Sequence, residues 1–177
     1  PWLVPKTEPV FIAVGSLTEQ KGFSTLLESF FLVNKQIISR LIILGEGPLR
    51  QELEARALEL GIQKKVDFHG FIENPFSLMA SSDVFVLSSK WEGLPNVLIQ
   101  AVSLGMRIVA TDCTSGPQEI LDNGKFGTLV EVGNIKMLSS AMLSSLEKQH
   151  DSDYVKSRAK HFSSDTIIPQ YIKVLVK

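Results

Sequence analysis

The sequence predicts one α/β domain, built on a doubly wound, Rossmann-like parallel sheet of about six strands with helices on both faces. Short runs that are apolar on both faces alternate with stretches of helical periodicity, which is the pattern of a parallel sheet covered on both sides. The chain has 177 residues, of which 44% are hydrophobic. A chain of this size can bury a substantial core as one domain.

Six runs rich in β-branched and other apolar residues are the candidate strands. They are Val10–Val14, Leu41–Leu44, Lys65–Phe68, Val84–Leu87, Arg107–Thr111 and Gly127–Val130. Between the first runs, apolar side chains recur at helical spacing, first at Phe23, Leu26, Leu27, Phe30 and Phe31 and then at Leu49, Leu53, Ala57 and Leu60. Pro48 suits the first turn of the second helix and Gly61 its C-cap.

The C-terminal third changes character. Helices are expected over Met137–Leu146, Asp153–Phe162 and Ile167–Val176, so residues 151–177 form C-terminal helices of the same domain. Residues 1–9 resemble a linker, and the chain begins without Met. These features indicate a fragment of a longer protein.

Composition excludes several classes of function. The formal net charge of -1 provides no general basic field for nucleic acid. The longest apolar runs have the length of a strand, far short of a membrane span. The lone Cys113 cannot form an internal disulfide, which fits a cytoplasmic protein.

Ligands of such sheets bind at the carboxyl ends of the strands, so the loops at that edge are the candidates. The first loop, Gly15–Phe23, carries Lys21 just before Gly22 and a helix start. It is not a P-loop, because the Lys precedes the Gly. Lys21 either binds a phosphate as a point charge or is a solvated turn lysine.

The next two loops are weaker candidates. Gly45–Pro48 superficially resembles a dinucleotide fingerprint, but Arg50 occupies the third glycine position, which favours a tight strand-to-helix turn. In His69–Pro75, Gly70 would let a flat base approach the backbone. His69 has no further ligand at metal spacing, and we interpret it as a hydrogen-bonded structural histidine.

Glu92–Gln100 is the most informative loop. Glu92 precedes a Gly/Pro turn, Pro95 suits a helix start, and the first amides of that helix can face a phosphate. Glu92 would be costly to bury without partners, so it is either solvated or hydrogen-bonded to a ligand. Gln100 either looks back toward a bound molecule or is an ordinary surface residue of the helix.

The fifth loop, Asp112–Ile120, feeds a Ser/Gly/Pro turn and a short helix, for which Thr114 or Ser115 would be the N-cap. Cys113 has no evident His partner, so a nucleophilic role is disfavoured. Together the five loops would place an ammonium, several helix N-termini and hydroxyl-binding groups along one edge. Such a set can hold a phosphorylated, polyhydroxylated molecule.

At this point the sequence resembles a known family. The segments Val14–Gly22, Gly45–Pro48, Phe68–Gly70, Glu92–Leu98 and Gly116–Ile120 resemble, in order and spacing, the C-terminal half of family 4 retaining glycosyltransferases of the GT-B fold. The match covers nearly the whole chain, and it is closest to bacterial enzymes that build capsule, O-antigen or other lipid-linked glycans.

The resemblance implies a role for each loop. Lys21 would contact the donor diphosphate, with Gly15 and Ser16 in the same loop, and Glu92 would bind hydroxyls of the donor sugar. These two are the implied catalytic residues. Amides around Leu94, Asn96 and Val97 would lie near the phosphates, Gln100 would face the ribose, and Phe71, Ile72 and Glu73 would border the base. Related enzymes need no metal, and no cofactor is expected.

Two residues depart from the family pattern. Ser16 stands where an arginine is usual, which leaves Lys21 with more of the phosphate charge. Gln100 stands where a second glutamate is usual, and as a neutral acceptor it forgoes about 1 kcal/mol of charge-assisted bonding. Both changes would weaken donor binding or select a different donor.

The resemblance also implies partners. These are a nucleotide-sugar donor, with UDP favoured, a glycan or lipid-linked acceptor, and a missing N-terminal domain of the same protein. Peripheral contact with the inner face of the membrane would come from the full-length protein. The chain alone is expected to bind donor with little or no transfer. The alternatives are a degenerate, non-catalytic nucleotide-sugar-binding module and a GT-B-like sugar-nucleotide epimerase, whereas an NAD-dependent oxidoreductase fits worst.

Overall fold

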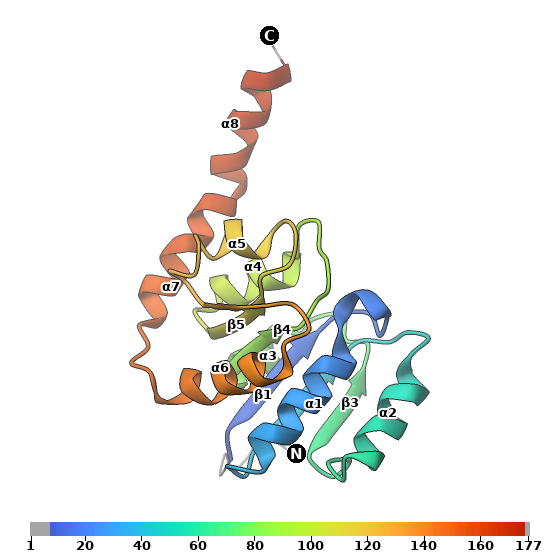
Figure 1. Ribbon diagram of the computed structural model, residues 1–177. Helices are drawn as coiled ribbons and strands as arrows, with labels where there is room; N and C mark the ends of the chain where they lie inside the picture. The colour runs from blue at the N-terminus through green and yellow to red at the C-terminus, as the bar shows by residue number, and fades with distance from the viewer. Residues whose placement is uncertain (1–7, 176–177) are drawn as a thin grey trace.

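The computed structural model describes residues 8–175, and its centre is a six-stranded parallel sheet in the order β3-β2-β1-β4-β5-β6 (Figure 1). The strands are β1 (Val10–Val14), β2 (Arg40–Leu44), β3 (Val66–Gly70), β4 (Val84–Leu87), β5 (Arg107–Thr111) and β6 (Thr128–Val130). Every neighbouring pair runs parallel. The predicted doubly wound sheet is therefore confirmed.

Helices cover both faces of this sheet. They are α1 (Phe23–Asn34), α2 (Arg50–Glu59), α3 (Phe76–Ser81), α4 (Asn96–Ser103), α5 (Pro117–Ile120), α6 (Ile135–Glu147), α7 (Ser152–Ala159) and α8 (Ser164–Leu175), with 3₁₀ turns η1 (Glu19–Lys21) and η2 (Lys160–Phe162). Buried side chains of α1, α2 and α6 pack on one face, and those of α3, α4, α5 and α7 pack on the other.

Side chains that alternate in direction along each strand explain why the sheet has a separate core on each face. In β1, Phe11 and Ala13 join the core under α1, α2 and α6, while Val10 and Ile12 join the opposite core. Successive residues of a strand point to opposite faces, so a strand covered on both sides must be apolar throughout. All four of these side chains are at most 2% exposed.

Element boundaries differ modestly from the sequence expectations. Strand β2 begins one residue early, β3 runs on to Gly70, and β6 starts at Thr128. The short helix α3 was not predicted. The helix expected over 153–162 ends at Ala159 and continues as a 3₁₀ turn, and α8 begins three residues early, at Ser164. Val176 and residues 1–7 of the expected linker lie outside the described residues.

Three predictions about the ends of helices can be compared with the structure. Gly61 has φ of 71° just after the C-cap Leu60, as expected for a helix stop. Pro48 lies before the N-cap Leu49 and so is in the turn rather than the helix. The predicted N-cap at Thr114 or Ser115 is wrong, because Gly116 holds that place and no side chain caps the helix.

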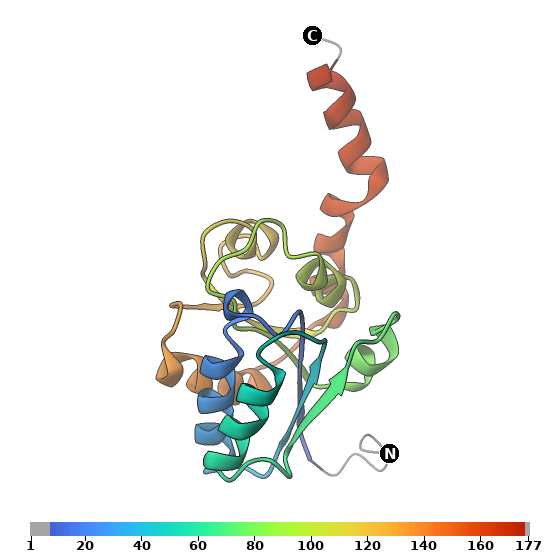
Figure 2. The same cartoon turned by 90° about the vertical axis from the view of Figure 1, so that its right-hand side faces the viewer.

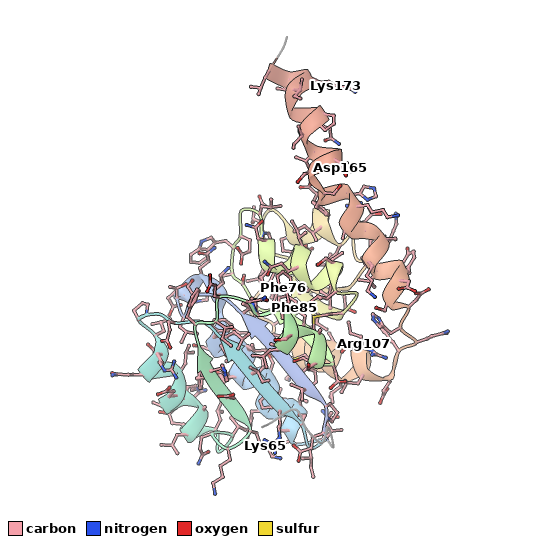
Figure 3. The ribbon with its side chains drawn as sticks, turned by 180° about the vertical axis from the view of Figure 1, so that it is seen from behind. Lys65, Phe76, Phe85, Arg107, Asp165 and Lys173 are labelled. Atoms are coloured by element: carbon pink, nitrogen blue, oxygen red, sulfur yellow. The ribbon has the colours of Figure 1, made fainter. Side chains whose placement is uncertain are left out.

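The helix α8 projects away from the sheet, as the two perpendicular views in Figures 1 and 2 show. Its side chains Ile168, Ile172, Val174 and Leu175 are each more than half exposed. Figure 3 shows the same projection from behind, with Asp165 and Lys173 labelled along the helix. Within residues 8–175, no helix has the length and apolar character that crossing a membrane requires.

Candidate functional site

The loops that follow β1 and β4 meet at the centre of the carboxyl edge. The sheet order places β1 and β4 side by side, with β2 and β3 continuing to one side and β5 and β6 to the other. The order of strands therefore reverses between β1 and β4, and the crevice outside such a switch point is where open α/β sheets bind ligands. Lys21 comes from the first loop and Glu92 from the second.

Hydrogen bonds to main-chain carbonyls of the first loop hold the two loops together. The Ser88 hydroxyl donates to the Lys21 carbonyl at 2.7 Å, and the Lys90 amide donates to the Gln20 carbonyl at 2.7 Å. Gly22 has φ of 62°, and a Cβ there would lie 2.2 Å from the Ser88 carbonyl oxygen. Only glycine permits this close approach, so Gly22 holds Lys21 against the β4 loop.

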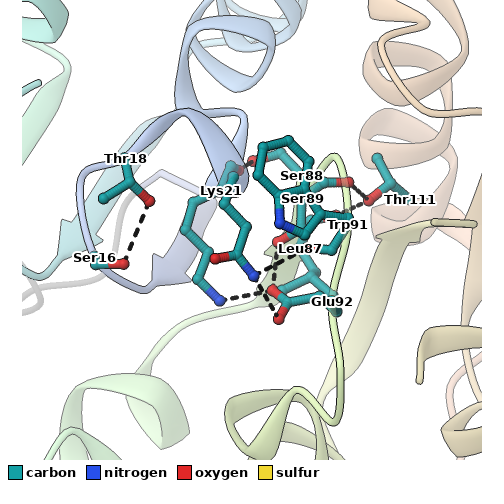
Figure 4. A network of polar contacts seen from close by, with 10 residues as sticks. Ser16, Thr18, Lys21, Leu87, Ser88, Ser89, Trp91, Glu92 and Thr111 are labelled. Carbon is teal, nitrogen blue, oxygen red and sulfur yellow. Dashed lines mark hydrogen bonds and ion pairs between the residues drawn. The ribbon is translucent and has the colours of Figure 1, made fainter. Parts of the chain in front are cut away.

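Lys21 and Glu92 form a buried ion pair. The Lys21 Nζ lies 2.6 Å from Glu92 Oε1, and the two side chains are only 16% and 6% exposed (Figure 4). The Ser89 hydroxyl donates to the same carboxylate oxygen at 2.7 Å, and Gln20 Nε2 approaches the other oxygen at 3.5 Å. The carboxylate is thus held by internal donors, as a buried charge requires.

This arrangement excludes the solvated alternative for each residue, whereas ligand binding by either one stays a prediction. Glu92 is neither solvated nor dependent on a ligand, because Lys21 and Ser89 satisfy it. Lys21 is likewise not a solvated turn lysine. The sequence could not predict this ion pair, because Lys21 and Glu92 are 71 residues apart. They meet only because β1 and β4 are neighbours in the sheet.

The neighbouring strand β5 supports the same loop. The Thr111 hydroxyl, fully buried, donates to the Ser89 carbonyl at 2.6 Å (Figure 4). Burial first, and then the negative charge of Glu92, raise the pKa of the Cys113 thiol above its usual value. A thiol with a raised pKa stays protonated near neutral pH, so the structure agrees that Cys113 is not a nucleophile.

The start of α4, in the segment that follows Glu92, has unpaired backbone amides. Within the described residues, the amides of Asn96 and Val97 make no hydrogen bond to the protein, and Pro95 at the N-cap provides no side-chain cap. The φ of Gly116 is 88°, and a Cβ there would lie 2.4 Å from Pro95 Cδ, so the β5 loop packs tightly on this turn. Free amides at a helix N-terminus favour a bound anion.

Four of the residues predicted to bind the nucleotide-sugar donor line one hollow of about 360 Å³. Gly15 and Ser16 from the β1 loop meet Phe71 and Ile72 from the β3 loop, with Leu44, Gly45 and Glu46 between them. The Phe71 side chain is 76% exposed at the rim. An exposed aromatic ring beside a backbone-lined hollow can stack with a flat base.

The glycines of the Gly45–Pro48 turn have a structural role. A Cβ at Gly45, whose φ is 141°, would lie 2.0 Å from the Gly15 carbonyl oxygen. Arg50 pairs with Glu46 and donates to the Phe68 carbonyl at 2.7 Å. The turn therefore packs against the β1 loop, in agreement with the sequence interpretation.

The remaining predicted residues lie elsewhere. Leu94, Asn96 and Gln100 line a second hollow of about 630 Å³ together with Glu119 and the first turns of α8. Gln100 is half-buried, and its side-chain amide has no hydrogen-bond partner among the described residues. Val97 is half-buried against the core that contains Leu98, and Glu73 is exposed beyond the first hollow.

His69 behaves as a structural residue. Its Nδ1 lies 3.1 Å from Asp67 Oδ2 on the same strand, so it is hydrogen-bonded as predicted. Residues 8–175 contain no cluster of three or more His, Cys, Asp or Glu side chains that could hold a metal ion.

Sequence reasoning missed the residues that hold Glu92 in place. Ser88 and Ser89 are 3% and 0% exposed at the end of β4, and Thr111 is 1% exposed at the end of β5. Small hydroxyl residues directly after a fully apolar strand were the available signal. Their partners are 67, 3 and 22 residues away in sequence, so the pattern alone could not assign them.

Comparisons with known proteins identify the family of the chain. The family described as "Glycosyl transferases group 1" matches residues 1–162. An uncharacterized glycosyltransferase of Methanocaldococcus jannaschii is 36% identical over 95% of this chain and 49% of its own length. An N-acetylgalactosaminyltransferase of Campylobacter jejuni that is named for a diphospho-undecaprenol substrate is 33% identical over 93% of this chain and 46% of its own length.

Solved structures share the fold at lower identity. The lipopolysaccharide outer core galactosyltransferase WaaB in its apo form has a TM-score of 0.84 and 23% identity, covering 98% of this chain and 50% of its own. HepE of Anabaena in complex with UDP has a TM-score of 0.82 and 23% identity, covering 96% and 49%. The chain thus spans about half the length of these relatives. It belongs to the group 1 glycosyl transferases, and its fold is that of the C-terminal half of GT-B enzymes.

Proposed function

We propose that this chain is the donor-binding half of a glycosyltransferase and holds a nucleotide-diphosphate sugar, with UDP favoured, at the β1–β4 switch point. The observation that carries the proposal is the Lys21–Glu92 pair beside the unpaired amides of α4. A cation and a helix N-terminus suit a diphosphate, and a fixed carboxylate suits sugar hydroxyls. The UDP found with HepE of Anabaena supports the choice of base.

Each part of the donor has a place that the geometry supports. The base would enter the hollow of Gly15, Ser16, Phe71 and Ile72. The phosphates would lie toward the amides of Asn96 and Val97 and toward Lys21, and the sugar would face Glu92. Gln100 would contact the ribose only if the donor reaches across the α4 start, because it lines the separate hollow near α8.

Catalysis would be metal-independent retaining transfer. Lys21 and the α4 amides would stabilise the negative charge that develops on the leaving nucleotide diphosphate. The Glu92 carboxylate already occupies one donor of Lys21, whose ammonium has three, so the phosphate shares the cation rather than displacing the pair. Ser16, which lines the first hollow, would offer the donor a hydroxyl group but no charge.

The acceptor and the transfer step would depend on the part of the protein that the relatives have and this chain does not cover. A glycan or lipid-linked acceptor is supported by the substrate named for the Campylobacter jejuni relative. The 177-residue chain alone would bind donor and transfer little or no sugar. Measurable transfer by this chain alone, with a donor and a lipid-linked acceptor, contradicts that part of the proposal.

The direct test is a titration of the chain with UDP, GDP, ADP and their sugars, followed by thermal shift or calorimetry. A ligand at a hundred times its dissociation constant should stabilise the fold by about 2.7 kcal/mol. Lys21→Met should abolish the stabilisation by nucleotide. Lys90→Met, which removes an exposed lysine of the loop after β4, should keep that stabilisation. Absence of any nucleotide response in the wild type overturns the proposal.

Position 100 allows a sharper test of the donor pose. In the full-length protein, Gln100→Glu should tighten donor binding about fivefold if the side chain contacts a ribose hydroxyl, which corresponds to about 1 kcal/mol. The matched control is Gln118→Glu, at an exposed position on α5. Equal affinities in wild type and Gln100→Glu would place the ribose away from α4.

One alternative retains a specific observation in its favour. Ser16 is exposed in the first hollow, and Gln100 is a neutral amide without a partner, so both departures from the family pattern lower the charge available to a donor. A non-catalytic nucleotide-sugar-binding module would have these features. Donor binding without transfer in the full-length protein would favour it, and transfer would eliminate it.

A further inference from the structure

A second polar hollow lies at the opposite, amino-terminal edge of the sheet. It has a volume of about 340 Å³ and is bounded by the first residues of β5 and β6, the loop before β6 and the connection from α6 to α7. Its lining includes Arg107, Lys125, Phe126, Lys148, His150 and Tyr154. None of these residues belongs to the proposed donor site.

Arg107 is the unusual residue of this hollow. Its Nε is inaccessible to solvent and has no hydrogen-bond partner, and it is the one such side-chain atom among the described residues. No ion pair to its guanidinium occurs within residues 8–175. Figure 3 shows Arg107 between the sheet and the C-terminal helices. A buried donor without a partner is rare in folded proteins, and it leaves the guanidinium without an internal acceptor on that side, while its terminal nitrogens are not buried.

The other charges of the hollow also favour an anion. Three side chains of the lining carry a positive charge at neutral pH, and one is a carboxylate. The cations are Arg107, Lys125 and Lys148, and the carboxylate is Asp151. Asp151 is already engaged, because its Oδ1 accepts the Tyr154 amide at 2.9 Å as the cap of α7. Lys125 is paired with Asp122 at 2.8 Å, which raises its pKa and keeps it protonated.

His150 and an aromatic wall complete the hollow. His150 Nε2 lies 2.8 Å from the Gly105 carbonyl oxygen, so this nitrogen carries a proton and the ring is held in place. Phe126 and Tyr154 stack with centroids 4.9 Å apart. Tyr154 is half exposed, so the stacked pair borders the hollow and the solvent. An organic group attached to an anion would find apolar contact there.

We propose that this hollow binds a phosphate group, either as free phosphate or as the headgroup of an anionic lipid. The planar guanidinium of Arg107 matches the oxygens of a phosphate, and its two terminal nitrogens, which unlike the Nε are not buried, would donate two parallel hydrogen bonds. Lys148 adds a second cation at the rim.

The site is separate from the proposed donor site and does not rest on it. Arg107 is the first residue of β5, whereas Thr111, which supports the Ser89 loop, is the last. Four strand residues at about 3.3 Å each place the two ends about 13 Å apart. Loss of donor binding would therefore leave this proposal unchanged.

The experiment measures the thermal shift of the chain in inorganic phosphate against sodium chloride of equal ionic strength. Its second arm measures flotation with phosphatidylcholine vesicles that contain or lack phosphatidylglycerol. The variants are Arg107→Met, the charge-matched control Lys64→Met at an exposed position on the same edge, and a second control, Lys90→Met, at an exposed position on the opposite edge. Arg107→Lys tests whether charge alone is sufficient.

The proposal expects Arg107→Met to weaken phosphate or lipid binding at least about tenfold, while Lys64→Met and Lys90→Met retain it. Arg107→Lys should restore only part of the affinity, because it lacks the planar pair of donors. A thermal response to phosphate identifies the free anion, and flotation without that response identifies the lipid headgroup. The proposal is overturned if neither probe binds, if Arg107→Met binds like the wild type, or if Lys64→Met or Lys90→Met abolishes the response instead.

Discussion

The two edges of the sheet hold their cations in opposite ways. At the carboxyl edge, Lys21 lies 2.6 Å from a carboxylate that is 6% exposed, and Ser89 fixes the same oxygen. At the amino edge, the Arg107 Nε is buried with no partner among the described residues. Lys21 lies in the 3₁₀ turn after β1 and Arg107 is the first residue of β5, and neither sequence context predicts this difference.

The difference determines what a ligand would gain at each edge. A phosphate that reaches Lys21 meets a cation whose charge is already partly balanced, so the pair orients the ligand more than it attracts it. A phosphate that reaches the terminal nitrogens of Arg107 meets a guanidinium whose charge no carboxylate among the described residues balances, so the bond forms without disturbing a protein contact. Removing each cation should therefore have very different effects on the fold.

The largest effect is expected for Lys21→Met. Removal of the lysine leaves the Glu92 charge buried without its cation, which should cost about 4 kcal/mol in free energy of unfolding. Urea denaturation measures the change. Lys90→Met is the control, because the Lys90–Glu19 pair is exposed and should contribute less than about 1 kcal/mol. The double variant Lys21→Met/Glu92→Gln should regain part of the loss, and failure to do so contradicts the pairing.

Next in size is the effect of Gly22→Ala. The new Cβ would lie 2.2 Å from the Ser88 carbonyl oxygen at a φ of 62°, so strain and displacement together should cost about 3 kcal/mol. Gly133→Ala, with φ of 75° and no atom near its Cβ, isolates the strain alone and should cost about 1 kcal/mol. Equal losses in the two variants would show that the β1 and β4 loops are not held together at Gly22.

Ser89→Ala should have a smaller effect. It removes the hydroxyl that donates to Glu92 at 2.7 Å, and loss of a hydrogen bond to a carboxylate should cost about 2 kcal/mol. Ser16→Ala is the control, since that hydroxyl is exposed and should change stability by less than about 0.5 kcal/mol. Chemical denaturation of both variants distinguishes a carboxylate held by Ser89 from one held by Lys21 alone.

The smallest effect on the fold is expected for Arg107→Met without phosphate. The variant removes an unsatisfied buried donor and keeps most of the side-chain volume, so stability should stay within about 0.5 kcal/mol of the wild type or rise. The same denaturation experiment measures it. A loss comparable to that of Lys21→Met would mean that Arg107 has a structural partner, and the contrast between the two edges would fail.

The sheet was predictable because its signal is local. Runs such as Val84–Leu87 are apolar at every position, which only a strand covered on both faces requires, and the stripe from Phe23 to Phe31 repeats at helical spacing. Cap positions were less predictable. Thr114 and Ser115 have suitable side chains for an N-cap, but the turn at Gly116 brings the β5 loop against Pro95, and that contact determines where the helix begins.

The candidate site was predicted only as a set of loops. Glu92 and Lys21 were identified from their turns, yet their ion pair depends on β1 and β4 being neighbours, which is a property of the strand order. Gln100 and Ser16 were expected at one bound donor, and the structure places them in two hollows. Burial and partner choice at such positions depend on contacts between distant segments.

The sequence by itself therefore determined the order and type of the main elements and the family, and it predicted the edge of the sheet where a ligand is expected, because periodicity and turn chemistry act over a few residues. Only the tertiary structure decided that Lys21 is paired with Glu92 and that the Arg107 Nε has no hydrogen-bond partner among residues 8–175. The physical reason is that the energy of a buried charge depends on the groups around it in space, and these come from segments far apart in the chain.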